Sequence, residues 1–318
     1  MAARTALLVC AWRITNAVIV RDFERDATVL GAYKPPPPLL AAPSPKCRDP
    51  PQETEELERL EWCKQCYVDS MTALFHQKGS DIIIGANDGQ KYDPAHWLDY
   101  WRNVPDHKKV FVEPVPPIFA KLQNNTKSLG NVLALNSAVR GKNNPSELVM
   151  YCWDLDMVDS AVKHGAKPLP PEVRQPKEYW SYLCSVDRRA VLETSNVLDT
   201  PEYSRLSSTA QARVRAEVDL YIKEYTVPAL TPKEIVRLAG PEDVRYVQID
   251  VEGLDTQIVQ SLPFGEDGFW PEVILYENHD DAPARRLLRE QGYYVCCCFS
   301  KWGNNVLAVR SNQSQATH

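Results

Sequence analysis

Acidic and imidazole side chains that could move a proton follow two strand-like apolar runs late in the chain. Asp250 ends one run with Glu252 two residues on, and Glu277 follows the next run with His279 two residues on. Alternate residues of an extended chain point to the same side, so each pair can face one reactant. Two close carboxylates tend to share a proton, which suits a general base. The alternatives are helix capping by Asp250 and Glu252, a structural His279, and a divalent metal held by all four groups.

A glycine turn follows the apolar run 82–84 and is the main candidate for a ligand-binding loop. Three successive isoleucines are typical of a strand buried on both faces in a parallel sheet. Gly85 and Gly89 let the backbone bend sharply and approach a ligand closely. A strand that leads into a glycine loop forms the nucleotide pocket of many α/β folds, although it is also an ordinary strand-to-helix connection.

The elements that position these residues alternate along the chain. Helical periodicity and strand-like runs follow one another, which predicts parallel pairing with right-handed crossovers. We therefore predict an α/β fold with a seven-stranded, mostly parallel sheet that ends in an antiparallel hairpin. The predicted strands are 82–84, 109–113, 132–135, 245–250, 272–276, 293–298 and 305–309, and the predicted helices are 55–77, one opening at Asp93-Pro94, 114–125, 255–262 and 284–291.

The chain outside this alternation divides into two further parts. Residues 1–51 contain eight of the 25 prolines, which predicts a disordered extension and linker before a domain at 52–318. Residues 146–230 carry tryptophans and prolines without regular alternation. We interpret this segment as an insertion over the substrate pocket, with one inserted strand and irregular helices.

Composition excludes several classes of function. The chain has 318 residues, 44% hydrophobic content, 25% charged content and a net charge of −6, as in soluble globular proteins. No basic stripe is present, so nucleic acid is not expected as a partner. The apolar stretch 6–20 is interrupted by Arg13 and Asn16 and falls short of the roughly twenty residues that span a bilayer. A cytoplasmic location is favoured, unless residues 1–20 act as a signal or anchor. Cys63 and Cys66, one helical turn apart, are interpreted as packing residues.

Six blocks of sequence stand in order at 84–89 with 93–94, 112–116, 136–138, 179–188, 249–255 and 275–277. Together they resemble FkbM-type S-adenosylmethionine-dependent methyltransferases of the branch with an Ile-Gly-Ala-Asn-Asp-Gly loop. They extend from about residue 80 to residue 310. Many relatives place an Asp two residues before the first glycine, where this chain has Ile83. The cofactor's amino group is then expected on Asp88, Asn87 or the backbone.

The resemblance implies S-adenosylmethionine as cofactor, bound where the first three strands of the predicted sheet end. The glycine loop would wrap the methionine part through backbone N–H groups, Glu113 would accept the ribose hydroxyls, and Ser137 with Ala138 would lie beside the adenine. Glu113 as a helix cap, and residues 137–138 as a simple turn, are the alternatives. The implied cofactor-binding residues are Gly85, Ala86, Asn87, Asp88, Gly89, Glu113, Pro114, Ser137 and Ala138.

The expected activity is therefore methyl transfer, most simply to a hydroxyl oxygen of a sugar or small hydroxylated metabolite. The acceptor would be a small molecule or a glycan, and Asp250, Glu252, Glu277 and His279 are the candidates for the catalytic base. A catalytically silent, methyltransferase-like binding module is the alternative. An NAD-dependent oxidoreductase is disfavoured because the loop is Gly-x-x-x-Gly rather than Gly-x-Gly-x-x-Gly.

Overall fold

The computed structural model describes residues 56–74, 77–89, 106–142, 144–154, 183–194, 198, 200–277, 282–298 and 305–310. The predicted helix at Asp93-Pro94 and the predicted extension 1–51 lie outside these residues. The described residues divide into two compact units, one within 79–270 and the other made of those before residue 79 and after residue 270.

Four parallel strands form the centre of the 79–270 unit. β1 pairs with β2 on one side and β7 on the other, and β2 pairs with β3. Every residue of β1 is buried, as the isoleucine run predicts. Helix α4 packs on β3, α9 on β1 and β2, and α10 on β7. The bounds are β1 Ser80–Ile84, β2 Lys108–Val112, β3 Val132–Leu135, β7 Val244–Ile249, α4 Pro116–Thr126, α9 Pro232–Ala239 and α10 Asp255–Gln260.

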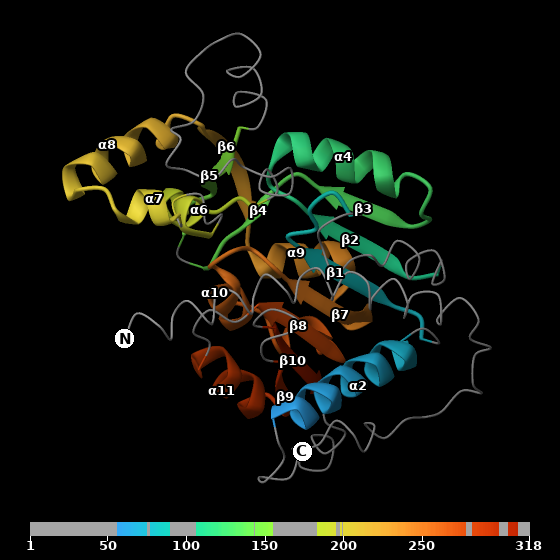
Figure 1. Cartoon of the computed structure of the whole chain (residues 1–318). Helices are drawn as coiled ribbons and strands as arrows, with labels where there is room; N and C mark the ends of the chain where they lie inside the picture. The colour runs from blue at the N-terminus through green and yellow to red at the C-terminus, as the bar shows by residue number, and fades with distance from the viewer. Residues whose placement is uncertain are drawn as a thin grey trace. The chain divides into compact units, whose positions relative to one another are not determined.

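A second, three-stranded sheet is formed by strands from the described part of 138–230. Its order is β4-β6-β5, with β4 parallel and β5 antiparallel to the long strand β6. Figure 1 shows α6, α7 and α8 gathered beside β5 and β6. The prediction of one strand with irregular helices in 146–230 was therefore wrong, because this segment contains two strands, β5 and β6, and three regular helices among its described residues. The bounds are β4 Ala138–Val139, β5 Glu147–Trp153, α6 Arg188–Thr194, α7 Pro201–Ser204, α8 Ser208–Asp219 and β6 Ile222–Leu230.

The other unit contains the predicted C-terminal hairpin. Strand β10 pairs antiparallel with both β9 and β8, and helices α2 and α11 pack on β9. The apolar residues of β10 are fully or nearly fully buried. The bounds are α2 Glu56–Leu74, β8 Val273–Glu277, α11 Ala282–Glu290, β9 Tyr293–Cys298 and β10 Asn305–Arg310.

The large sheet has the strand order β3-β2-β1-β7-β8-β10-β9. All seven predicted strands occur in it, so the predicted α/β fold with a mostly parallel sheet and a closing antiparallel hairpin is confirmed. Among the residues described, no helix combines the length and the apolar character needed to cross a membrane.

Helix α9 was missed by the sequence analysis, although its start carries a strong local signal. The Thr231 side chain accepts from the Glu234 backbone N–H, and the Glu234 carboxylate accepts from the Thr231 N–H. This reciprocal capping box, with Pro232 in the first turn, satisfies backbone donors that a helix start otherwise leaves unpaired.

Cysteines cross-link the chain, which the sequence analysis did not predict. Cys152 at the end of β5 forms a disulfide with Cys184, with the two Cα atoms 4.5 Å apart. A bond that closes a loop of this length stabilises a fold by about 3–4 kcal/mol. Cys66 is also disulfide-bonded, so its interpretation as a packing residue alone was wrong.

Asp81, at the amino end of β1, is a buried acid whose ionisation should limit stability. Its Oδ2 lies 2.9 Å from His107 Nδ1, and Lys109 is its neighbour in register on β2. Burial raises the pKa of Asp81, against the opposing effects of His107 and Lys109. Because the folded pKa lies above the unfolded one, this contribution to stability is full at low pH and lost as pH rises through the folded pKa.

We therefore expect Asp81→Asn to gain stability relative to the native chain as pH rises from acid to neutral. Urea unfolding of both proteins across that range measures the difference. A free-energy gap that stays constant with pH would contradict the prediction. Asp243→Asn, an exposed acid just before β7, provides the control.

Candidate active site

A small pocket lies at the carboxyl ends of β1 and β2. In open α/β sheets this is the end at which ligands bind. Four of the predicted cofactor-binding residues line it, and the second sheet contributes an apolar wall. Its lining includes Gly85, Pro114, Ser137, Ala138, Met150 and Val186.

The glycine loop is closed by its own hydrogen bonds. The Gly85 and Ala86 N–H groups both donate to the Val112 carbonyl, and the Gly89 N–H donates to the Ala86 carbonyl. The Asn87 and Asp88 N–H groups donate to side-chain oxygens of Glu113 and Asn87, respectively. Each of these five N–H groups thus has an acceptor within the protein, and the binding of a methionine by this loop stays a prediction. These hydrogen bonds fix the shape of the glycine loop.

Gly85 is the position at which that shape depends on glycine. Its φ is +79°, and a Cβ built on it would lie 1.7 Å from the Asp250 carbonyl oxygen. The Asp250 N–H in turn donates to the Ile84 carbonyl at 3.0 Å. The glycine loop and the first candidate acid are therefore in direct backbone contact. Ile83, two residues before Gly85, is completely buried in β1.

Glu113 immediately follows β2 and is buried, with 5% of its surface exposed. Its Oε2 accepts from the Asn87 N–H at 3.0 Å, and its Oε1 accepts from the Val115 N–H at 2.9 Å. Glu113 thus joins the glycine loop to the start of α4. A carboxylate has about four lone-pair sites. The binding of ribose hydroxyls by Glu113 stays a prediction.

The turn after β3 is held by side-chain bonds to backbone. Asn136 Nδ2 donates to the Glu113 and Pro114 carbonyls, each at 2.9 Å. The Ser137 hydroxyl lies 2.9 Å from the Pro228 carbonyl of β6. Ser137 and Ala138 are buried and line the pocket, so the interpretation as a simple strand-to-helix turn does not hold: Ala138 begins β4.

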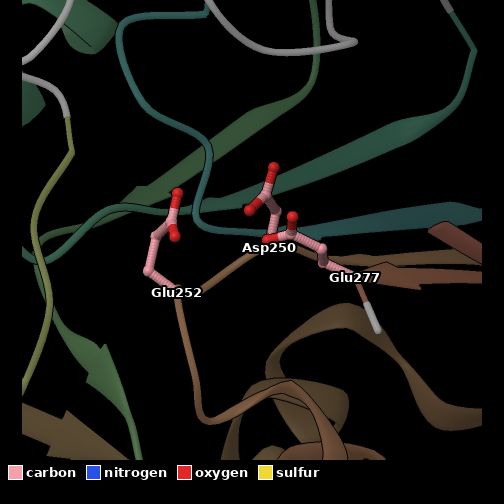
Figure 2. A group of neighbouring side chains, drawn as sticks. All are labelled: Asp250, Glu252 and Glu277. Carbon is pink, nitrogen blue, oxygen red and sulfur yellow. The ribbon is translucent and has the colours of Figure 1, made fainter. Parts of the chain in front are cut away.

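Asp250 and Glu252 follow β7, and their carboxyl groups point to the same side of the chain in Figure 2. One carboxylate oxygen of Asp250 lies within 4.8 Å of one of Glu252, and both side chains are partly buried. Glu252 has a φ of +52°, which is uncommon for a residue with a side chain. The N-cap residue of α10 is Leu254, whose side chain makes no capping bond.

Asp255 builds the loop that presents this acid pair, and sequence reasoning gave it no role. It is buried, its Oδ1 accepts from the Val251 N–H, and its Oδ2 accepts from the Gly253 N–H, both at 3.2 Å. These bonds bracket Glu252 and stabilise its left-handed backbone. An acid placed three residues after a candidate acid is the only sequence signal for this function.

The remaining two candidate bases are placed differently. Glu277 is the last residue of β8 and belongs to the other compact unit; its side chain is drawn in Figure 2. His279 lies outside the described residues. Within the 79–270 unit, the structure therefore brings Asp250 and Glu252 together beside the pocket-lining residues Val251 and Leu254.

Comparison with known proteins places the chain in a family. Residues 84–295, more than half of the chain, match the methyltransferase FkbM domain. No curated protein matches. A similar solved structure is the precorrin-6y C5,15-methyltransferase from Geobacter metallireducens GS-15, at 12% identity and a TM-score of 0.31, covering 78% of this chain and 88% of that one. The family match spans the glycine loop, Glu113, the pocket and the acid pair, and the chain belongs to the FkbM methyltransferase family.

Proposed function

We propose that this methyltransferase uses S-adenosylmethionine to methylate a hydroxyl oxygen of a sugar or other small hydroxylated acceptor. The observation that carries the proposal is the pocket itself. Predicted cofactor residues Gly85, Pro114, Ser137 and Ala138 line one space at the carboxyl ends of the parallel strands. Val251 and Leu254, from the loop that carries the acid pair, line the same space.

The bound cofactor would supply the activated methyl group, so the protein has to orient the acceptor, exclude water and take a proton. Alignment of two reactants can lower a barrier by about 7–11 kcal/mol. The apolar wall formed by Met150, Val186 and Leu254 excludes water from one side of the pocket. Gly85 keeps the glycine loop against Asp250 without a side chain between them.

Proton removal from the acceptor hydroxyl is assigned to the acid pair. Asp250 or Glu252 would accept the proton of the acceptor hydroxyl, and repulsion from the neighbouring carboxylate would favour this proton uptake. Glu277 and His279 stay in the proposal as further acceptor ligands or bases. A double variant with Asp250→Asn and Glu252→Gln tests this assignment. If it still transfers methyl groups, the base is Glu277 or His279.

The proposal is tested by incubating the purified chain with deuterated-methyl S-adenosylmethionine and a small-molecule and glycan extract. Mass spectrometry should detect a product that carries the labelled methyl group. Calorimetry with S-adenosylhomocysteine should show binding to the same preparation. Absence of binding would refute the cofactor assignment, whereas binding without transfer to any acceptor would favour the silent binding module.

Glu113→Gln is expected to weaken binding of S-adenosylhomocysteine about 10- to 100-fold, the scale of a charge-assisted hydrogen bond. Glu113 also holds Asn87 and Val115, so a loss of affinity alone does not identify a ribose contact. Calorimetry is therefore repeated with an analogue that lacks both ribose hydroxyls.

The effect of Glu113→Gln should largely disappear with that analogue. An equal loss for both ligands would assign Glu113 to loop structure and remove the ribose assignment. Glu202→Gln, which changes an exposed acid on α7, serves as the matched control.

A further inference from the structure

Ser185 connects the second sheet to the loop that carries the acid pair. Its hydroxyl donates to the Glu252 carbonyl oxygen at 3.1 Å and accepts from the Asp187 N–H at 3.1 Å. Ser185 is buried, with 4% of its surface exposed. Because both the donor and an acceptor site of the hydroxyl are used, its orientation is set by its neighbours. The bond therefore acts on the Glu252 backbone from a defined direction.

Ser185 is itself held firmly. Its N–H donates to the Tyr151 carbonyl at 3.0 Å, and the Tyr151 N–H donates to the Ser185 carbonyl at 2.8 Å. The residues next to this pair in sequence, Cys152 and Cys184, are joined by the disulfide. Two backbone bonds and a covalent cross-link thus fix Ser185 against β5.

The same attachment positions the apolar wall of the pocket. Met150 and Val186, which line the pocket, each lie two residues from a cysteine of the disulfide. Glu252 needs such support because its left-handed backbone is unfavourable for a residue with a side chain. Asp255 supports the loop from the α10 side through the Val251 and Gly253 N–H groups, and Ser185 supports it from the second sheet.

We propose that Ser185 is a positioning residue, which holds Glu252 in register with Asp250 and is itself anchored by the Cys152–Cys184 disulfide. The proposal concerns the acid pair and rests on the proposed function for its effect on turnover. The support that Ser185 gives to residues 250–255 can be measured whether or not the protein shows activity. Loss of the hydroxyl should loosen that loop while the glycine loop and Glu113 stay in place.

Ser185→Ala is the first test, with Ser80→Ala as its matched control. Ser80 is also buried, and its hydroxyl donates to the Ala239 carbonyl. It lies at the amino end of β1, whereas the glycine loop follows the carboxyl end. Hydrogen–deuterium exchange on the full chain should quicken in the peptide covering 250–255 in Ser185→Ala and stay native there in Ser80→Ala. Ser185→Thr, which keeps the hydroxyl, should restore native exchange.

Kinetics with the acceptor found by isotope labelling provide the second readout. Ser185→Ala should lower kcat about 10- to 100-fold, as expected for a misplaced reacting group. Affinity for S-adenosylhomocysteine should stay native, and Ser185→Thr should recover most of the rate. Native exchange in 250–255, or a fall in kcat no greater than that of Ser80→Ala, would overturn the proposal.

A paired Cys152→Ala, Cys184→Ala variant tests the anchor. Chemical reduction is avoided because Cys66 is also disulfide-bonded. The paired variant should reproduce the faster exchange in 250–255, and native exchange there would refute the role of the disulfide. If the native chain fails to bind S-adenosylhomocysteine, the proposed function fails, while the exchange results still decide whether Ser185 holds Glu252.

Discussion

Gly85→Ala is expected to destabilise the 79–270 unit severely and to abolish cofactor binding. The new Cβ would lie 1.7 Å from the Asp250 carbonyl oxygen, at a backbone φ of +79°. The backbone strain alone costs about 1–3 kcal/mol, and relief of the overlap requires β1 and the Asp250 loop to separate. Urea unfolding should therefore show a loss of at least about 3 kcal/mol, a value typical of strongly damaging substitutions.

Gly141→Ala is the matched control for this effect. A Cβ on Gly141 meets no atom closer than 3.6 Å, so the same chemical change should leave stability nearly native. Calorimetry with S-adenosylhomocysteine on both variants separates loss of binding from loss of folding. A Gly85→Ala chain with native stability and native affinity would show that the contact between the loop and Asp250 is dispensable.

Asp250→Asn is expected to lower turnover about 100- to 10,000-fold, the usual contribution of a general base. The substitution keeps the size of the side chain, and the backbone bond from the Asp250 N–H to Ile84 is unaffected. Affinity for S-adenosylhomocysteine should therefore stay native. Initial rates of labelled-methyl transfer, measured at saturating cofactor, test the expectation directly.

Asp243→Asn provides the comparison, because Asp243 is exposed and precedes the same strand at its amino end. It should transfer methyl groups at the native rate. If Asp250→Asn does the same, Asp250 is excluded as the base and Glu252 becomes the candidate. A large fall in cofactor affinity instead would assign Asp250 to the cofactor.

The central sheet could be predicted because its strands are short apolar runs whose burial leaves few alternatives. Three isoleucines in β1 and the alternation of strands with helices were enough to place β1, β2, β3 and β7. The second sheet was missed for a physical reason. Pro228 interrupts the strand pattern of β6, and a proline is tolerated there because β4 pairs only with Ala229 and Leu230.

The part of the site that escaped prediction is held by bonds between side chains and backbone. Spacing suggested that Asp250 and Glu252 face one side, but it carried no sign that Asp255 and Ser185 hold Glu252 from two directions. Spacing also gave no sign of the hydrogen bonds that the N–H groups of the glycine loop donate to Val112, Glu113 and the loop itself. Such bonds depend on where distant backbone atoms meet, which one sequence does not show.

The pairing of β4 with β6 determines which segment could be exchanged intact between related chains. Strand β6 binds Ala138 and Val139 through its last residues, and the Pro228 carbonyl meets the Ser137 hydroxyl. A chimera that replaces only residues 146–230 would leave two pocket residues beside a foreign strand edge. A segment that keeps the second sheet intact therefore begins at Ser137. A chimera that exchanges residues 137–230 as one piece would keep β4 and β6 paired as they are here.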